Sequence, residues 1–252
     1  MAFSHSFPNY DLHLTTIPGK NSKVMIVAHG MGANHTIVEN VESDDTLITF
    51  NFPDYDFIER NIQAEKTTYG TPDEILPLLF VIKKFVIDKG HSEIDLYGFS
   101  AGGGAIINAI GALNSSRFDD SLKQINIESP EKQIVLKAIQ KGQIILDCPL
   151  TSVREIIDFK GYNHELNVFS KRYQMNDMEP INAIKYLQGL SMNILVHFQK
   201  PDEILSNRDD SLFFNRLKEI NLGKTELVIG YDGGHNTHHK TLWDLWIKRH
   251  KQ

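Results

Sequence analysis

The fold is decided by residues 94–105, which read Ile-Asp-Leu-Tyr-Gly-Phe-Ser-Ala-Gly-Gly-Gly-Ala. The mostly apolar residues 94–97 predict a buried strand, and the residues after Ser100 predict a helix. Between them lies the pattern Gly98-Phe99-Ser100-Ala101-Gly102, in which glycines on either side let neighbouring backbone approach closely. A sharp turn from strand to helix at this point would lift the serine oxygen above a sheet. Ser100 is therefore the candidate nucleophile.

A short apolar run followed by a helical stretch recurs along the chain. The runs occupy residues 24–28, 47–50, 94–97, 143–146, 193–196 and 226–229. Most are continuous rather than alternating, as expected of strands that are buried on both faces of a parallel sheet. Residues 9–17 alternate instead and predict an antiparallel edge strand. The sequence therefore predicts an α/β fold with a mostly parallel, doubly wound sheet that binds ligands at the C-terminal ends of its strands.

The predicted helices begin at recognisable signals. The run Thr71-Pro72-Asp73-Glu74 combines a capping threonine, a proline in the first turn and a glutamate in capping-box position. This helix should reach about residue 89, with a kink or a late start near Pro77. The glycines at 102–104, in the first turn of the helix after Ser100, predict tight packing or a need for backbone access. Residues 114–142 predict two short polar helices.

Composition excludes several classes of protein. The chain has 252 residues, 41 % of them hydrophobic and 23 % charged, and no linker separates two compositions, so we expect one domain spanning residues 1–252. A net charge of −6 gives no support to a nucleic-acid partner. No apolar run approaches the roughly 18 residues of a membrane span, and we expect no signal peptide in residues 1–20. The single cysteine, Cys148, excludes intrachain disulfides and predicts a cytoplasmic protein.

Four short motifs, each near the end of an apolar run, make the chain resemble the α/β-hydrolase superfamily from about residue 20 to the C-terminus. They are His29-Gly30-Met31-Gly32, the turn at Ser100, Pro201-Asp202-Glu203-Ile204 and Gly233-Gly234-His235. The order of nucleophile, acid and histidine is the order of that superfamily. The resemblance implies the α/β-hydrolase fold with a small helical lid inserted at about residues 151–190.

The resemblance also implies a role for each residue. Ser100 would attack a carbonyl, and His235 would take its proton and return it to the leaving group. Asp202 would hold the imidazole in one tautomer, and the backbone N–H groups of Met31 and Ala101 would form the oxyanion hole. The implied activity is that of a serine hydrolase of the carboxylesterase or thioesterase type, which forms an acyl-enzyme on Ser100 and needs no cofactor or metal.

Alternatives remain for two of these residues. Asp147 follows the preceding apolar run and is a second candidate for the acid. His235 competes with His238, His239 and His250, but only His235 follows the pair of glycines that a tight turn after a strand requires. His29 is expected to be structural. A metal site is not expected, because no cysteine or carboxylate stands at zinc spacing around the histidines.

Two segments are expected to shape the substrate pocket, residues 51–69 and the predicted lid. Their aromatic and methionine residues are Phe52, Tyr55, Phe57, Tyr69, Phe159, Tyr162, Phe169, Tyr173, Met175 and Met178. An apolar lid over an uncharged entrance favours small-molecule acyl substrates of short or medium chain length. An amide- or peptide-cleaving hydrolase with the same triad is one alternative function, and a catalytically silent, ligand-binding protein of this fold is another.

Overall fold

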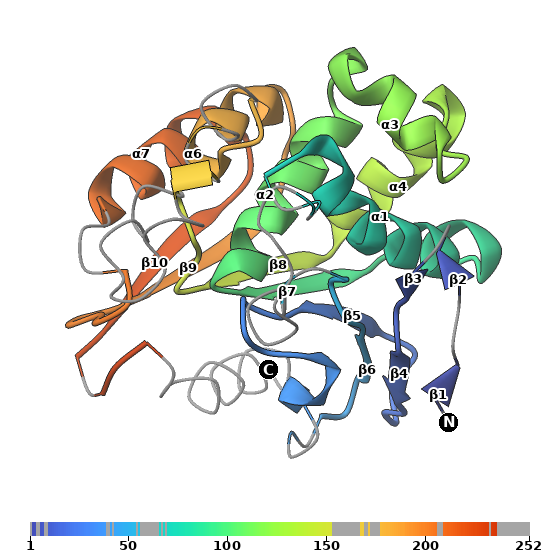
Figure 1. Ribbon diagram of the computed structural model, residues 1–252, viewed down its shortest axis with the longest axis horizontal. Helices are drawn as coiled ribbons and strands as arrows, with labels where there is room; N and C mark the ends of the chain where they lie inside the picture. The colour runs from blue at the N-terminus through green and yellow to red at the C-terminus, as the bar shows by residue number, and fades with distance from the viewer. Residues whose placement is uncertain are drawn as a thin grey trace.

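A sheet of eight strands forms the centre of the computed structural model (Figure 1). The structure describes residues 2–3, 6–7, 10–38, 41, 43–53, 55, 66, 68, 70–152, 167–168, 171, 177–205, 209–231 and 233–235. In spatial order the strands are β1 (Ala2–Phe3), β4 (Leu14–Ile17), β6 (Thr46–Thr49), β5 (Val24–Ala28), β7 (Asp95–Phe99), β8 (Gln143–Asp147), β9 (Asn193–Gln199) and β10 (Thr225–Gly230). A separate pair is formed by β2 (Ser6–Phe7) and β3 (Tyr10–Asp11).

The sheet is mostly parallel, as the sequence predicts. Strands β6, β5, β7, β8, β9 and β10 are parallel neighbours, whereas β4 is antiparallel to both β1 and β6. Each predicted apolar run forms one of the parallel strands, and β4 lies within the alternating segment 9–17. The prediction of an edge strand there is wrong, because β1 pairs with β4 on its outer side. Phe99 pairs with Asp147, and Asp147 pairs with His197. The C-terminal ends of β7, β8 and β9 therefore lie side by side.

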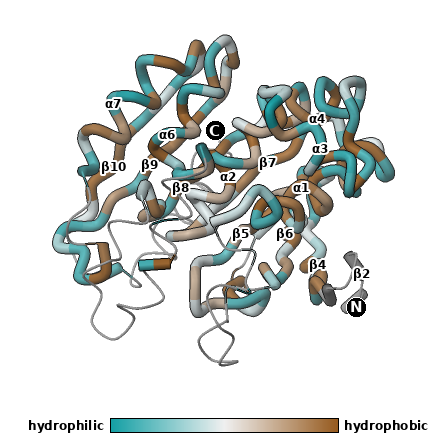
Figure 2. The backbone as a smooth tube through the Cα atoms, turned by 45° about the horizontal axis from the view of Figure 1, so that its top comes forward, coloured by the Kyte–Doolittle hydropathy of each residue, from teal (hydrophilic) through white to brown (hydrophobic). Residues whose placement is uncertain are grey.

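The helices in the described part of the chain differ in length and type. They are η1 (His35–Val38), η3 (Pro72–Ile75), α1 (Leu76–Lys83), η4 (Lys84–Asp88), α2 (Ala101–Leu113), η5 (Ser116–Phe118), α3 (Asp119–Lys123), α4 (Ser129–Lys141), α6 (Pro180–Ala183), η7 (Ile184–Leu187) and α7 (Asp210–Ile220). The α-helices that Figure 1 labels lie together on one face of the sheet. Hydrophobic and hydrophilic positions alternate along α4 and α7 (Figure 2), as expected of helices with one buried face.

The predicted helix over 71–89 consists of three consecutive segments. A 3₁₀ turn with Pro72 at its start leads into α1, and a π turn at 84–88 ends the helix. The α-helical part begins at Leu76, so the late start near Pro77 is confirmed. The predicted capping box is wrong, because Glu74 is buried and accepts hydrogen bonds from Tyr55 Oη (2.8 Å) and Gly70 N (2.7 Å). Because the Glu74 carboxylate makes these two contacts, it does not form the capping box that the local sequence pattern predicts.

The core has two parts, one on each face of the sheet. Alternate strand residues such as Ile26 and Leu96 pack with α1, α2 and α4 in the larger part, whereas Met25 and Tyr97 belong to the smaller one.

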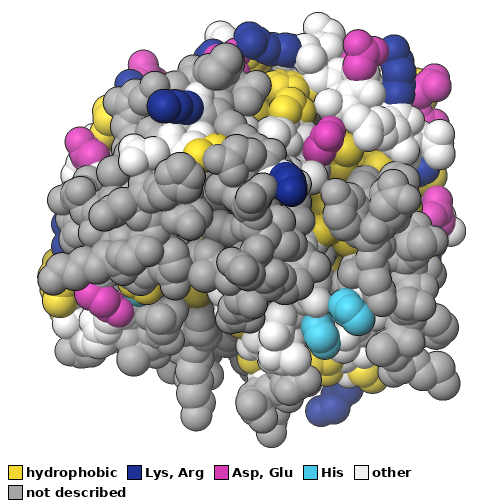
Figure 3. Space-filling model, in the orientation of Figure 1, with side chains coloured by type: hydrophobic (Ala, Val, Ile, Leu, Met, Phe, Trp, Pro, Cys, Tyr) yellow, Lys and Arg dark blue, Asp and Glu magenta, His cyan; other side chains and the backbone are white. Residues whose placement is uncertain are grey.

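The described part of the surface in Figure 3 carries charged side chains of both signs, interspersed with one another. Among the described helices, none combines the length and the hydrophobicity that a bilayer span requires.

Part of the predicted lid falls within the described residues. Helices α6 and η7, from its C-terminal half, pack on α2, and Ala183, Ile184 and Leu187 belong to the main core. Residues 153–166, 169–170 and 172–176 of the predicted lid lie outside the described residues. A lid over the strand ends therefore stays a prediction.

Candidate active site

Ser100 occupies a strained turn between β7 and α2. Its φ is 51° and its ψ is −120°, a combination that costs a residue with a Cβ atom about 1–3 kcal/mol. Neighbouring backbone fixes this conformation: Ser100 N donates to Asp147 O (2.9 Å), and Ser100 O accepts from Leu150 N (2.8 Å) and Gly103 N (3.0 Å). The strain at Ser100 is therefore supported by β8 and by the segment that follows it.

The glycines around Ser100 are required by close backbone packing. A Cβ on Gly102 would overlap the carbonyl oxygen of Ala28, at the end of β5. A Cβ on Gly98 would lie 2.7 Å from Gly103 Cα, and one on Gly103 would lie 2.8 Å from Pro149 Cβ. Real Cβ atoms do not approach other atoms this closely, so α2 can begin directly above β5 and β7 only without these side chains. This is the tight packing that the run of glycines predicts.

Asp202 and His235 form a buried pair beyond the ends of β9 and β10. Asp202 Oδ2 lies 2.8 Å from His235 Nδ1, and the two side chains are 3 % and 2 % exposed. Asp202 Oδ1 accepts from Ile204 N (3.1 Å) and Leu205 N (2.8 Å), which fixes the carboxylate. Because a carboxylate only accepts, the neutral imidazole of His235 carries its proton on Nδ1, which leaves Nε2 as the acceptor. That Nε2 is buried and has no hydrogen-bond partner in the described part of the chain.

Glu203 holds the turn that carries His235, and sequence reasoning missed this role. Its Oε2 accepts a hydrogen bond of 2.9 Å from His235 N. A Cβ on the preceding Gly234 would lie within 2.7 Å of three carboxylate atoms of Glu203. Glu203 follows Asp202 directly in the sequence, and this adjacency is the one signal that could have revealed it. The loops after β9 and β10 are thus joined twice, through Asp202 and through Glu203.

Ser100 and this pair follow the C-terminal ends of parallel strands in the same sheet. The ring of the preceding residue, Phe99, lies 5.1 Å from the His235 ring between centroids. No hydrogen bond joins Ser100 to His235 in the described structure. Hydrogen bonds between nucleophile and base are often long in unliganded proteins and shorten when substrate binds. The structure thus brings Asp202 and His235 together and places the residue before Ser100 against the His235 ring.

The residues expected to form the oxyanion hole flank Ser100. Ala101 is the first residue of α2, where N–H groups lack partners within the helix. Met31 lies in the turn after β5, and a Cβ on Gly30 in the same turn would lie 2.9 Å from Ser100 Cβ. Neither the Met31 nor the Ala101 N–H donates to another residue that the structure describes.

His29 is neutral and supports the turn after β5. Its Nδ1 donates to Gly30 O (2.8 Å), and its Nε2 accepts from Phe52 N (3.0 Å). Burial lowers the pKa of His29 from 6.5 to about 4. The rings of Phe52 and Tyr55 pack on its imidazole. His29 therefore has the structural role expected of it, and these two aromatic residues belong to the main core.

Stability should depend on pH through His29. The unfolded chain protonates this imidazole below about pH 6.5 and the folded chain only below about 4, so its contribution is complete above pH 6.5 and is lost as pH falls toward 4. The loss should be about 3 kcal/mol. In denaturant unfolding at pH 7, His29→Gln should have a lower free energy of unfolding than the wild type. The difference between the two proteins should become smaller toward pH 4. His13→Gln, a substitution at an exposed histidine, is the control and should have the same free energy of unfolding as the wild type. A difference between His29→Gln and the wild type that stays constant with pH would contradict the assignment.

Asp147 is paired with a histidine other than His235. Its Oδ1 lies 2.8 Å from His197 Nδ1, and its Oδ2 accepts a 2.5 Å hydrogen bond from Tyr97 Oη. Burial, followed by the neighbouring Asp147 carboxylate, raises the pKa of Tyr97 well above its usual value, so this phenol remains a donor. The geometry favours Asp202 over Asp147 as the partner of His235. Sequence reasoning missed His197, because its pairing depends on strand register.

Several residues singled out in the sequence cannot be placed. The competing histidines His238, His239 and His250 lie outside the described residues, as do Phe57, Tyr69, Phe159, Tyr162, Phe169, Tyr173 and Met175. Met178 is described and belongs to the main core.

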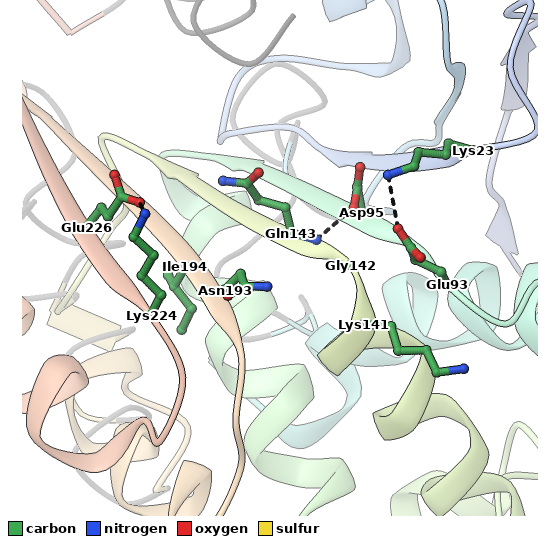
Figure 4. Close-up of a pocket in the computed structure, with 10 residues that line it drawn as sticks. All are labelled: Lys23, Glu93, Asp95, Lys141, Gly142, Gln143, Asn193, Ile194, Lys224 and Glu226. Atoms are coloured by element: carbon green, nitrogen blue, oxygen red, sulfur yellow. Dashed lines mark hydrogen bonds and ion pairs between the residues drawn. The ribbon is translucent and has the colours of Figure 1, made fainter. Parts of the chain in front are cut away.

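A cavity of about 330 Å³ lies at the N-terminal ends of the parallel strands, opposite to the ends that carry the candidate active site (Figure 4). Gln143 and Asn193, the first residues of β8 and β9, contribute to its lining. Lys23 and Glu93 form an ion pair of 3.1 Å at its margin. Because Ser100 lies beyond the other ends of the strands, this cavity is not part of the candidate active site.

Comparison with known proteins gives matches at the level of structure. No protein-family model and no curated protein sequence matches the chain. Over 99 % of its length it is similar to an acylaminoacyl peptidase from Pyrococcus horikoshii, with a TM-score of 0.65 and 13 % identity, and it spans 41 % of that chain. Over 99 % of its length it is also similar to a thermophilic esterase from Thermogutta terrifontis with butyrate bound, of which it spans 92 %, with a TM-score of 0.63 and 13 % identity.

A third similar structure is a monoacylglycerol lipase from Paleococcus ferrophilus. The match covers 95 % of this chain and 98 % of that one, with a TM-score of 0.58 and 11 % identity. Identities this low carry information about the fold only. Together with the strand order, the turn at Ser100 and the pairing of Asp202 with His235, these likenesses show that the chain has the α/β-hydrolase fold.

Proposed function

We propose that the protein is a serine hydrolase that cleaves a carboxylic ester or thioester of a small molecule through an acyl-enzyme on Ser100. The observation that carries the proposal is the buried contact of 2.8 Å between Asp202 Oδ2 and His235 Nδ1. This pair lies beyond the same ends of the strands as Ser100. The φ of 51° at Ser100 is that of a nucleophile raised above a sheet. A buried thiol as the single cysteine suits a reducing compartment, so the proposal includes a cytoplasmic location.

The proposed reaction has two stages. Ser100 Oγ attacks the carbonyl carbon while His235 Nε2 takes its proton, and Asp202 stabilises the resulting imidazolium. The oxyanion accepts hydrogen bonds from the N–H groups of Met31 and Ala101. Collapse of the tetrahedral intermediate expels an alcohol or thiol, which receives the proton from His235. Water then attacks the acyl-enzyme by the same steps and releases the acid, with no cofactor or metal required.

Two of the similar structures favour an ester substrate. The Thermogutta terrifontis protein is an esterase that has butyrate bound, and the Paleococcus ferrophilus protein is a monoacylglycerol lipase. The likeness to an acylaminoacyl peptidase favours amide or peptide cleavage as the second candidate. Because this chain spans 41 % of that peptidase, ester or thioester cleavage is the stronger proposal.

A kinetic series separates the candidate functions. Aryl esters and thioesters with acyl chains of increasing length should be cleaved fastest at short to medium length, and N-acylated amino acid anilides should be much slower. The rate should fall on acidification, because a protonated His235 cannot accept the serine proton. Faster cleavage of the anilides would favour the peptidase function. Tight binding of these acyl compounds without turnover would favour a silent ligand-binding protein.

A further inference from the structure

Cys148 lies between the two buried pairs of aspartate and histidine. It follows β8 directly, its φ is 43°, and its side chain is buried. The ligand atoms of Cys148, Asp202 and His235 all lie within 4.8 Å of one another. The same limit holds for Asp147, Cys148 and His197. Neither the fold nor the proposed hydrolysis explains a thiol at this position.

We propose that Cys148, Asp202 and His235 form a site for a thiophilic divalent cation, Zn²⁺, and that Zn²⁺ bound there inhibits the enzyme. A thiolate, a carboxylate and an imidazole are a donor set that Zn²⁺ accepts, and three protein ligands leave a fourth position for water. Because the three ligand atoms lie within 4.8 Å of one another, small movements of the side chains would be enough to coordinate one ion. The inhibition rests on the proposed function, whereas the binding does not.

We assign the ion to the Asp202 cluster because backbone N–H groups hold this carboxylate through Oδ1, whereas both oxygens of Asp147 contact side chains. Both oxygens of Asp147 already take part in side-chain hydrogen bonds, with His197 Nδ1 and with Tyr97 Oη. In the Asp202 cluster an ion would replace the contact between Oδ2 and His235 Nδ1, and the bonds from backbone N–H groups to Oδ1 can persist. The pair of Asp147 and His197 would then be a polar neighbour of the thiolate, since His197 Nδ1 lies 3.9 Å from Cys148 Sγ.

The balance of protons explains the inhibition. Zn²⁺ would form bonds to Sγ, Oδ2 and Nδ1 and would lose water molecules from its hydration shell. The Nδ1 proton of His235 would move to Nε2, which has no partner in the described structure. The thiol proton would leave to solvent, so binding releases one proton. A protonated Nε2 cannot accept the proton of Ser100, and Asp202 no longer contacts the imidazole. The same coordination that binds the ion therefore removes the base.

Metal binding can be measured without any substrate. Zn²⁺ affinity is obtained by competition with a chromophoric chelator, and Co²⁺ reports a thiolate ligand through its charge-transfer absorption. The wild type should bind one Zn²⁺ more tightly as pH rises, because a proton is released. Even an outer-shell partner contributes about 10- to 100-fold to metal affinity, so Cys148→Ser and Cys148→Ala should each weaken binding by about 100-fold or more. His235→Gln should weaken it similarly.

The matched control is a substitution at His35, which stacks on His13 elsewhere in the described part of the chain. His13 and His35 stack with ring centroids 5.8 Å apart and could hold Zn²⁺ without a thiol. His35→Gln should leave Zn²⁺ affinity and the Co²⁺ absorption unchanged. Each variant is first compared with the wild type in thermal unfolding, and Cys148→Ser retains nearly the size of the native side chain.

The ratio of hydrolysis rates with and without Zn²⁺, measured within each protein, tests the inhibition. Wild-type activity should be lost at one equivalent, restored by a chelator and insensitive to Mg²⁺, which prefers oxygen ligands. Undiminished Zn²⁺ affinity in both Cys148 variants, or loss of binding in His197→Gln but not in His235→Gln, would overturn the assignment. A chain that binds Zn²⁺ as described but hydrolyses nothing would refute the proposed function alone. An active enzyme that ignores Zn²⁺ would refute this inference alone.

Discussion

Ser100→Ala should lower kcat for ester hydrolysis by about 10⁶-fold, the cost of removing a nucleophile that acts together with its base. The physical reason is that no acyl-enzyme can form without Oγ, while the oxyanion donors and the pocket remain. Turnover is measured at saturating ester, with protein of verified purity, because trace contamination would hide a loss this large. Ser115→Ala, at the N-cap of η5, is the matched serine control and should retain full activity.

Stability separates a chemical loss from a structural one. A glycine adopts the φ of 51° at this position without strain, so Ser100→Gly should be inactive yet as stable as the wild type or more stable by about 1 kcal/mol. Urea unfolding measures this difference. Retention of more than a small fraction of activity in the folded Ser100→Ala and Ser100→Gly proteins would show that the nucleophile lies elsewhere.

Asp202→Asn should lower kcat by about 10⁴-fold with little change in KM. An asparagine in this place stabilises the wrong tautomer of the base and no longer balances the charge of an imidazolium. The buried contact of 2.8 Å with His235 Nδ1 is the interaction that the substitution alters.

Asp147→Asn is the matched control, because Asp147 is an equally buried aspartate that contacts His197 and Tyr97. It should keep kcat within about tenfold of the wild type, but it should lower the melting temperature, because two buried side chains then share a weaker acceptor. Measuring kcat, KM and thermal unfolding for both variants tests the choice of acid. The reverse pattern, with activity lost in Asp147→Asn and kept in Asp202→Asn, would move the acid to Asp147.

The parts of the fold that could be predicted are those encoded locally. The continuous apolar runs at 24–28 and 143–146 predict parallel strands because both of their faces are buried. The glycines around Ser100 predict close backbone packing for the same local reason. The capping box at Thr71 failed because Glu74 contacts Tyr55 and Gly70, and no local pattern encodes those contacts.

The candidate site shows the same division. Ser100, Asp202 and His235 could be proposed because each follows a recognisable run, but Asp147 also follows one, so spacing alone left the acid open. The structure separates the two carboxylates through strand order and register, which pair Asp147 with His197 across β8 and β9. The position of Cys148 between both pairs could not be predicted either, because it depends on three loops that meet in space.

The most direct test of an activated Ser100 is intact-mass spectrometry after treatment with a fluorophosphonate. The wild type should gain one adduct per chain, mapped to Ser100 by peptide analysis, and His235→Ala should react far more slowly. Ser100→Ala should gain none at this position. A folded wild-type protein that gains no adduct, or one that is labelled equally well without His235, would contradict the account.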